Sequence, residues 1–182
     1  MNDGLIPMRY AKAIYEVAQE KACAKQVYNL MKEIVSVFAT RPQLQSTLSN
    51  PYIAVSDKIA LLGTIAKASD ADPRFVDDIC RLLARNGRID LTRDIAAAYI
   101  RLYRKINRIY EVKIVSAAPM SEAESNRLLS LIENHLKGGT MEISYSVDPA
   151  LIGGFSVSVG NERIDASISN ELKQLRLNLI KK

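Results

Sequence analysis

The chain has no tryptophan, a single histidine and only two cysteines. With His135 as the one histidine, neither a histidine-based triad nor a multi-histidine metal site can be built. Cys23 and Cys80 are far apart and lack zinc or redox spacing, so we expect partly buried free thiols in a reducing compartment. No glycine-rich phosphate loop carries the lysine that nucleotide binding needs. These absences argue against an enzyme, and we expect no catalytic, cofactor-binding or metal-binding residues.

Long apolar runs are also missing, since the longest, such as 59–63 and 95–100, fall far short of the ~20 residues that cross a bilayer. Because Asp3 and Pro7 interrupt the first residues, we see no signal peptide and expect a mature cytosolic protein. The 182 residues are 48% hydrophobic, enough for a globular core built on Leu, Ile, Val and Ala. A net charge of +5 and a pI near 9.2 favour acidic partners but are modest for a dedicated nucleic-acid binder.

Residues 8 to about 110 have the apolar spacing of successive helices, which predicts a compact bundle of about six. Ser56 and Asp90 are candidate N-caps for two of them. Asp72-Pro73 should start another helix, because Asp accepts hydrogen bonds from free N–H groups and Pro is tolerated in the first turn. Asn86-Gly87 should end that helix, since both residues tolerate a left-handed backbone. The last helix of the bundle is predicted to extend through Ile109.

After Tyr110 the apolar period falls from that of a helix to that of a strand. Ser121 and Glu124 form a capping box at the start of a further helix, which Gly138-Gly139 should end. Residues 141–147 then alternate between apolar and polar as a strand does. We therefore predict a mainly α protein: a helical bundle over residues 1–108 and a small α+β domain of four short strands and two helices over 109–182.

The end of the chain combines several turn and strand signals. Gly153-Gly154 predicts a bend or bulge, and residues 155–159 alternate as a strand whose serines should face water. Gly160-Asn161 is a turn, and residues 163–166 are long enough for another strand. A final amphipathic helix is predicted from its apolar stripe of Ile168, Leu172, Leu175 and Leu179.

This succession of turn, strand, turn and helix resembles the C-terminal signature of the ATP synthase delta subunit family, which includes the oligomycin-sensitivity-conferring protein. The matching signature residues are Gly153, Gly154, Phe155, Gly160, Asp165 and Ser167, together with Leu151, Ile152, Val157, Ile164, Leu172 and Leu175. Ala166 departs from the pattern, because many relatives have Gly there. Segments 9–13, 86–88 and 115–121 also look like the family in the family's order, so the resemblance covers nearly the whole chain.

The resemblance implies a non-catalytic subunit at the top of the peripheral stalk of an F-type ATP synthase. Such a subunit would be peripheral to the membrane, on the cytoplasmic face of the bacterial inner membrane. In the family, the N-terminal bundle holds the N-terminal helix of an alpha subunit between its first and fifth helices. The matching positions here are Tyr10, Ala13 and Ile14 on one side and Ile79, Leu82 and Leu83 on the other. Each of them could instead face the bundle core.

The resemblance also implies that the C-terminal helices of the stalk subunit b bind the C-terminal domain. Leu177 and Ile180 fall off the apolar stripe of the last helix and leave apolar surface unexplained. We therefore expect these two residues to contact the stalk, whereas Leu175 should pack within the domain.

A second hypothesis is a basic helical adaptor that binds nucleic acid or another acidic partner. Its evidence is a basic stripe on the long helix, at helical spacing: Arg101, Arg104, Lys105 and Arg108. The same stripe could be an ordinary solvated face. Only Tyr99, Tyr103 and Tyr110 accompany it as aromatics that could stack on bases, and no recognised nucleic-acid-binding module is present.

Overall fold

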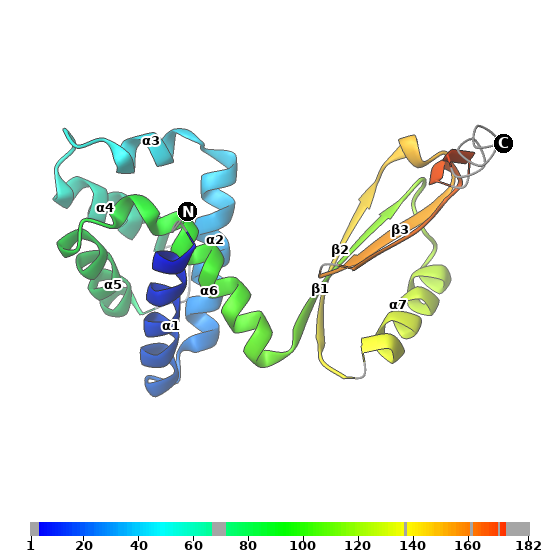
Figure 1. Cartoon of the computed structure of the whole chain (residues 1–182), viewed down its shortest axis with the longest axis horizontal. Helices are drawn as coiled ribbons and strands as arrows, with labels where there is room; N and C mark the ends of the chain where they lie inside the picture. The colour runs from blue at the N-terminus through cyan, green and yellow to red at the C-terminus, as the bar shows by residue number, and fades with distance from the viewer. Residues whose placement is uncertain (1–3, 67–71, 137, 161, 171, 174–182) are drawn as a thin grey trace. The chain divides into compact units, whose positions relative to one another are not determined.

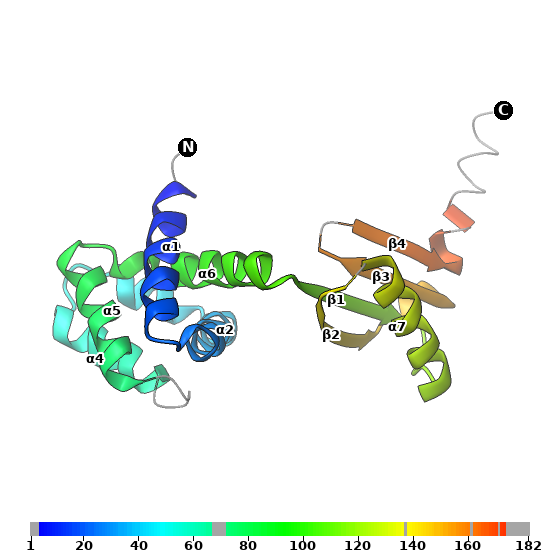
Figure 2. The ribbon, with the colours of Figure 1, turned by 90° about the horizontal axis from the view of Figure 1, so that it is seen from below.

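The computed structural model describes residues 4–66, 72–136, 138–160, 162–170, 172 and 173. It divides the chain into two compact units, Met1–Lys105 and Ile106–Lys182, each of which is treated by itself below. In the described residues the first unit is helical and the second combines a four-stranded sheet with one long helix, as Figures 1 and 2 show. This confirms the predicted fold class.

The first unit contains the six predicted α-helices within its described residues. They are α1 (Leu5–Glu20), α2 (Ala24–Thr40), α3 (Gln43–Ser49), α4 (Val55–Ala66), α5 (Pro73–Arg85) and α6 (Thr92–Asn107). A 3₁₀ turn, η1 (Ile89–Leu91), precedes α6.

The ends of α5 follow the predicted chemistry. Asp72 Oδ1 accepts a hydrogen bond of 2.9 Å from the Arg74 N–H, and Pro73 occupies the first helical position. At the other end Gly87 adopts a φ of +62°, which lets its N–H reach the Ala84 carbonyl at 3.0 Å. The start and stop signals of this helix are therefore confirmed.

Three other helix boundaries were predicted wrongly. Ser56 lies inside α4, which begins at Val55. Asp90 lies in η1, and Thr92 begins α6 while its hydroxyl donates to the Ile89 carbonyl at 2.6 Å. Ile109 opens a strand, because α6 ends at Asn107 and Arg108 turns the chain with a φ of +51°. Apolar spacing continues across Arg108, so the pattern alone did not reveal the break.

The core of the bundle is built from fully buried side chains of five helices: Val27, Leu30, Leu48, Leu83, Ile95 and Tyr99, with Ala11 and Ala18 of α1. Tyr99 donates a hydrogen bond of 3.1 Å to the Ala24 carbonyl, which satisfies its buried hydroxyl. Burial also raises the pKa of Tyr99, so the phenol remains a donor. Tyr103 stacks on Tyr28 with ring centroids 4.4 Å apart. These contacts tie α6 to α2.

The second unit consists of β1 (Ile109–Ser116), α7 (Glu122–Leu136), β2 (Thr140–Val147), β3 (Gly154–Val159) and β4 (Glu162–Ser167). A 3₁₀ turn, η2 (Pro149–Leu151), joins β2 to β3. The strand order is β2-β1-β3-β4. β1 pairs parallel with β2 and antiparallel with β3, and β3 pairs antiparallel with β4. Residues 168–170, 172 and 173 are helical, where the last helix was predicted to start.

The capping box predicted for α7 is present. Glu124 accepts from the Ser121 N–H at 3.0 Å and from its hydroxyl at 2.7 Å. The helix then packs against one face of the sheet, where Val112, Ile114, Val157 and Ile132 form a small core. The strand predicted after Tyr110 and the helix predicted to follow the capping box are therefore confirmed.

Ser156 and Ser158 of β3 were expected to face water, but Ser158 is half-buried and Ser156 is only 2% exposed. Its Oγ accepts a hydrogen bond of 3.0 Å from Arg163 Nε of β4. Since β3 is an inner strand of the sheet, a polar residue there needs a partner within the protein. The expectation for Ser156 was therefore wrong.

Candidate functional site

The six residues proposed to hold a partner helix divide into two groups. Ile14 and Leu83 are 4% and 2% exposed and belong to the bundle core. Ala13 is exposed, Leu82 is 44% exposed, and Tyr10 and Ile79 are half-buried. Only the second group offers surface to a partner in the folded bundle.

On α1 the accessible residues form a stripe next to the buried one. Ile6, Tyr10, Ala13 and Val17 recur at i, i+4, i+7 and i+11, which places them along one side of the helix. Val17 is exposed and extends the stripe beyond the residues that the motif in 9–13 had identified. Its helical spacing from Ala13 was visible in the sequence and could have included it.

On α5 the surface around Leu82 is hollowed. Asp78, Arg81, Leu82 and Arg85 line an open depression of about 420 Å³. Arg81 pairs with Asp77 one turn earlier, with 2.8 Å between Nη2 and Oδ2. The depression therefore combines one apolar side chain with charged groups around it.

α1 and α5 meet at one end and run in opposite directions, as Figures 1 and 2 show. Lys21, directly after α1, places its Nζ 5.0 Å from the centre of the Phe75 ring in the first turn of α5. The C-terminal end of α1 thus lies beside the N-terminal end of α5.

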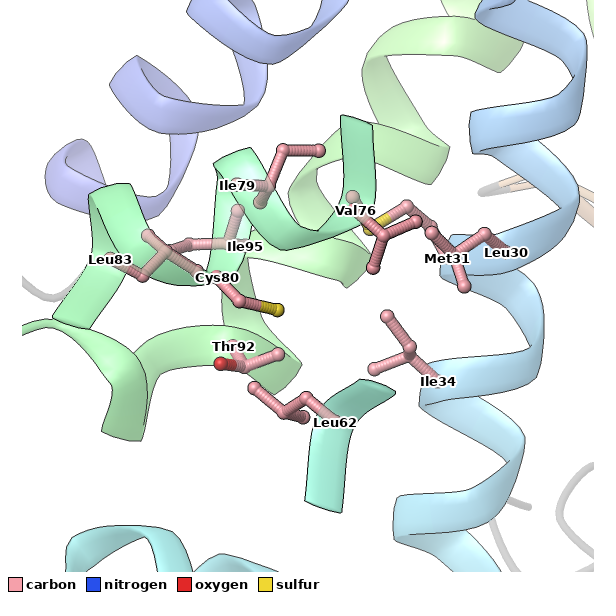
Figure 3. Close-up of a pocket in the computed structure, with 10 residues that line it drawn as sticks. All are labelled: Leu30, Met31, Ile34, Leu62, Val76, Ile79, Cys80, Leu83, Thr92 and Ile95. Carbon is pink, nitrogen blue, oxygen red and sulfur yellow. The ribbon is translucent and has the colours of Figure 1, made fainter. Parts of the chain in front are cut away.

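A separate cavity inside the bundle is not a binding site. It measures about 20 Å³, and Figure 3 shows that apolar side chains surround it. Its lining comprises Leu30, Met31, Ile34, Leu62, Val76, Ile79, Cys80, Leu83, Thr92 and Ile95. The Thr92 hydroxyl is already bonded to Ile89, and burial together with the charge of Asp77 raises the pKa of the Cys80 thiol to about 11. The cavity is a packing gap beside an unreactive thiol.

The basic stripe on α6 does not form a continuous free surface. Arg104 Nε donates to the Tyr28 hydroxyl at 2.9 Å, and Arg108 lies beyond the end of the helix. Tyr99 and Tyr103 are buried in the bundle and cannot stack on bases. The structure therefore lends no support to the nucleic-acid hypothesis.

Within the residues that the structure describes, no cluster of His, Cys, Asp and Glu could hold a metal ion. No helix in the same residues combines the length and apolar character that crossing a bilayer requires.

In the second unit, Asp165 and Ser167 connect β4 to the helix that follows it. Asp165 Oδ1 accepts from the Ser167 N–H at 3.2 Å and from its hydroxyl at 2.5 Å. Ser167 Oγ in turn accepts from the Asn170 N–H at 3.3 Å, which makes Ser167 the N-cap of the helix. The hydrogen bond from the Ser167 side chain is the main reason that the pKa of Asp165 lies below its ordinary value.

Gly154 allows β3 and β4 to approach closely. Its φ is +77°, and a Cβ at this position would lie 2.2 Å from the Ala166 carbonyl oxygen. A Cβ at Gly153, by contrast, would lie nearest the Ile168 side chain, 2.5 Å from its Cδ1. Gly160 begins the β3–β4 turn with a φ of +57°, and Phe155 packs against the small core. The predicted signature residues therefore shape one β-hairpin and the start of the helix after it.

An open hollow of about 610 Å³ lies between the end of β1, α7 and the turn before β3. Its apolar lining includes Met120, Leu128, Leu131, Ile152 and Phe155. Leu177 and Ile180, proposed to contact the stalk, and Leu175, expected to pack within the domain, lie outside the described residues.

Comparison with known proteins gives one consistent result. The family model of the ATP synthase delta (OSCP) subunit matches residues 6–179. Proteins named ATP synthase subunit delta are similar over essentially their whole length. The protein from Bacteroides thetaiotaomicron is 35% identical, covering 100% of this chain and 97% of its own, and the one from Anoxybacillus flavithermus is 31% identical, covering 98% and 99%.

Among solved structures, a chain of the Toxoplasma gondii mitochondrial ATP synthase hexamer, determined by cryo-EM, has a similar fold. The TM-score is 0.71, with 19% identity, and the similarity covers 96% of this chain and 97% of that chain.

Proposed function

Since this chain belongs to the ATP synthase delta (OSCP) subunit family, we propose that it joins the catalytic head of an F-type ATP synthase to the peripheral stalk through two separate contacts. The family is a non-catalytic subunit of the synthase, and the chain is accordingly not an enzyme. As a stator component it resists the torque of the rotor. Two docking surfaces in one chain suit this task, because each contact raises the effective concentration of the other.

The first proposed contact is between the helical bundle and the N-terminal helix of an alpha subunit. The supporting observation is the accessible apolar surface on α1 and α5, made by Tyr10, Ala13, Ile79 and Leu82. A helix that presents apolar residues at i, i+3, i+4 and i+7 matches such a surface. Ile14 and Leu83 support this surface from the core beneath it.

The second proposed contact is between the C-terminal unit and the C-terminal helices of the stalk subunit b. Supporting it are the apolar side chains that this unit leaves exposed, including Leu131, Ile152 and Ile164. Leu177 and Ile180 remain proposed stalk contacts on sequence grounds. We further propose that the complete assembly places the chain on the cytoplasmic face of the bacterial plasma membrane.

Substitution of Ala13 tests the first contact. Ala13→Glu introduces a carboxylate into the proposed apolar interface. Because a docked helix would bury this charge, the substitution should weaken binding of an alpha-subunit N-terminal peptide at least about tenfold. Ala13 is exposed in the isolated bundle, so the thermal melt should not change. Binding is measured by calorimetry and melting by circular dichroism.

Ala39→Glu is the matched control, because Ala39 is also exposed but lies on α2. It should bind the peptide like the wild type. Wild-type affinity in Ala13→Glu would refute the contact on α1.

A further inference from the structure

Charges are distributed unevenly along the two helices that flank the proposed docking surface. Residues 5–15 of α1 and 79–88 around the end of α5 contain no Asp or Glu. They do contain basic residues, all of which are exposed: Arg9, Lys12, Arg81, Arg85 and Arg88. The N-terminal half of α1 and the C-terminal half of α5 are thus purely basic.

The opposite halves are mainly acidic. Glu16 and Glu20 follow in α1, and Asp72, Asp77 and Asp78 stand at the start of α5. Two basic residues, Lys21 and Arg74, also lie there, and Lys21 is placed over the Phe75 ring. The acidic half therefore has more negative than positive side chains.

The fold places like halves of the two helices toward the same end of the bundle (Figures 1 and 2). Because the C-terminal end of α1 lies beside the N-terminal end of α5 and the two helices run in opposite directions, both acidic halves fall at one end of the surface. Both basic halves then fall at the other end. The apolar stripe of α1 and Leu82 of α5 lie within this gradient, and Arg81 and Arg85 border the hollow around Leu82.

We propose that this gradient orients the docked helix, so that an amphipathic helix with acidic residues toward one end binds with that end beside Arg81, Arg85 and Arg9. Apolar contacts supply most of the affinity, but an apolar stripe is compatible with both directions. Charge complementarity distinguishes them, because the reversed helix would place like charges together at both ends. The inference rests on the proposed docking of a helix on α1 and α5.

The direction can be read with a spin label. The probe is the alpha-subunit N-terminal peptide, carrying a nitroxide at its more acidic end or, in a second sample, at the other end. We expect the first label to broaden amide NMR signals of the full-length protein at residues 81–88 and the second to broaden those at 74–78. The opposite pattern, or equal broadening at both ends, would overturn the inference.

A charge reversal tests whether the basic residues of α5 orient the docked helix. Arg81→Glu combined with Arg85→Glu should weaken peptide binding about tenfold at low salt, with the difference shrinking as salt screens the charges. Lys25→Glu combined with Arg41→Glu makes the same change in net charge on exposed positions of α2 and its end, and should bind like the wild type. Equal affinity of the two double variants would contradict an orienting role for Arg81 and Arg85.

Different results would refute the proposed docking of the helix and the proposed direction of the docked helix. A wild-type protein that does not bind the peptide at all would refute the proposed head contact. Binding that occurs with random or reversed orientation would refute only the inference about the charge gradient.

Discussion

The two units of this chain reach stability by different routes. In the bundle, residues close in sequence form helices and the helices then bury whole side chains such as Tyr99, Leu30 and Leu83. In the C-terminal unit, β1 is the central partner of two strands that follow much later in the chain. Only four hydrophobic residues are buried in that unit's described core: Val112, Ile114, Ile132 and Val157.

The C-terminal unit also leaves more of its apolar pattern exposed. Ile143, Tyr145 and Val147 alternate on the edge strand β2 as core residues do, yet they remain 37%, 53% and 52% exposed. Tyr145 reaches α7 through its hydroxyl, 2.8 Å from the Ser125 Oγ. A sheet covered by one helix buries its central strands first, so the edges remain accessible to partners.

The largest loss of stability is expected for Gly154→Ala, in the C-terminal unit. The new Cβ would collide with the Ala166 carbonyl in a backbone conformation that L-residues avoid, at a cost of about 4 kcal/mol or more to the C-terminal unit. Hydrogen exchange followed by mass spectrometry should show loss of protection in 109–173 while α1–α6 keep theirs. If the bundle lost protection as well, the two units would not be independent in stability.

Gly160→Ala is the control for that experiment. Gly160 also has a positive φ, but a Cβ added there would meet no atom within 4 Å, so only the left-handed backbone cost of about 1–2 kcal/mol applies. If Gly160→Ala lost as much hydrogen-exchange protection as Gly154→Ala, the collision with the Ala166 carbonyl would not be the cause of the destabilisation.

A somewhat smaller loss of stability is expected for Leu83→Ala, in the helical bundle. Removing this buried side chain should lower the free energy of unfolding of the bundle by about 3 kcal/mol. Leu82→Ala, one position away and 44% exposed, should leave the melt nearly unchanged and weaken peptide binding. Chemical denaturation and calorimetry on both variants separate the two roles. An unchanged melt for Leu83→Ala would place Leu83 on the docking surface.

The smallest loss of stability is expected for Asp165→Asn, and this loss should depend on pH. Because the folded-state pKa of Asp165 lies below its ordinary value, its ionised form contributes stability above that value, and the contribution disappears as the pH falls through the folded-state pKa. The variant should melt below the wild type at neutral pH and approach it in acid. A difference that persisted unchanged at low pH would mean that the Asp165 charge is not involved.

Much of this architecture was predictable because the signals are local. Asp72-Pro73, Asn86-Gly87 and the Ser121–Glu124 capping box each act within one helical turn, and each was found as predicted. Family membership was also predictable, since the residues from Gly153 to Ser167 serve one hairpin and its helix cap in a fixed order.

The tertiary structure decided what local patterns could not. Ile14 and Leu83 have the same apolar character and helical spacing as Tyr10 and Leu82, and only the packing of neighbouring helices places the first pair in the core. The same holds for Ser156, which alternates like a solvent-facing residue but lies buried under Arg163. The charge gradient along α1 and α5 likewise exists only because the two helices run in opposite directions (Figures 1 and 2). Sequence spacing determines which residues share a face of one element, whereas burial and alignment depend on which other element covers that face.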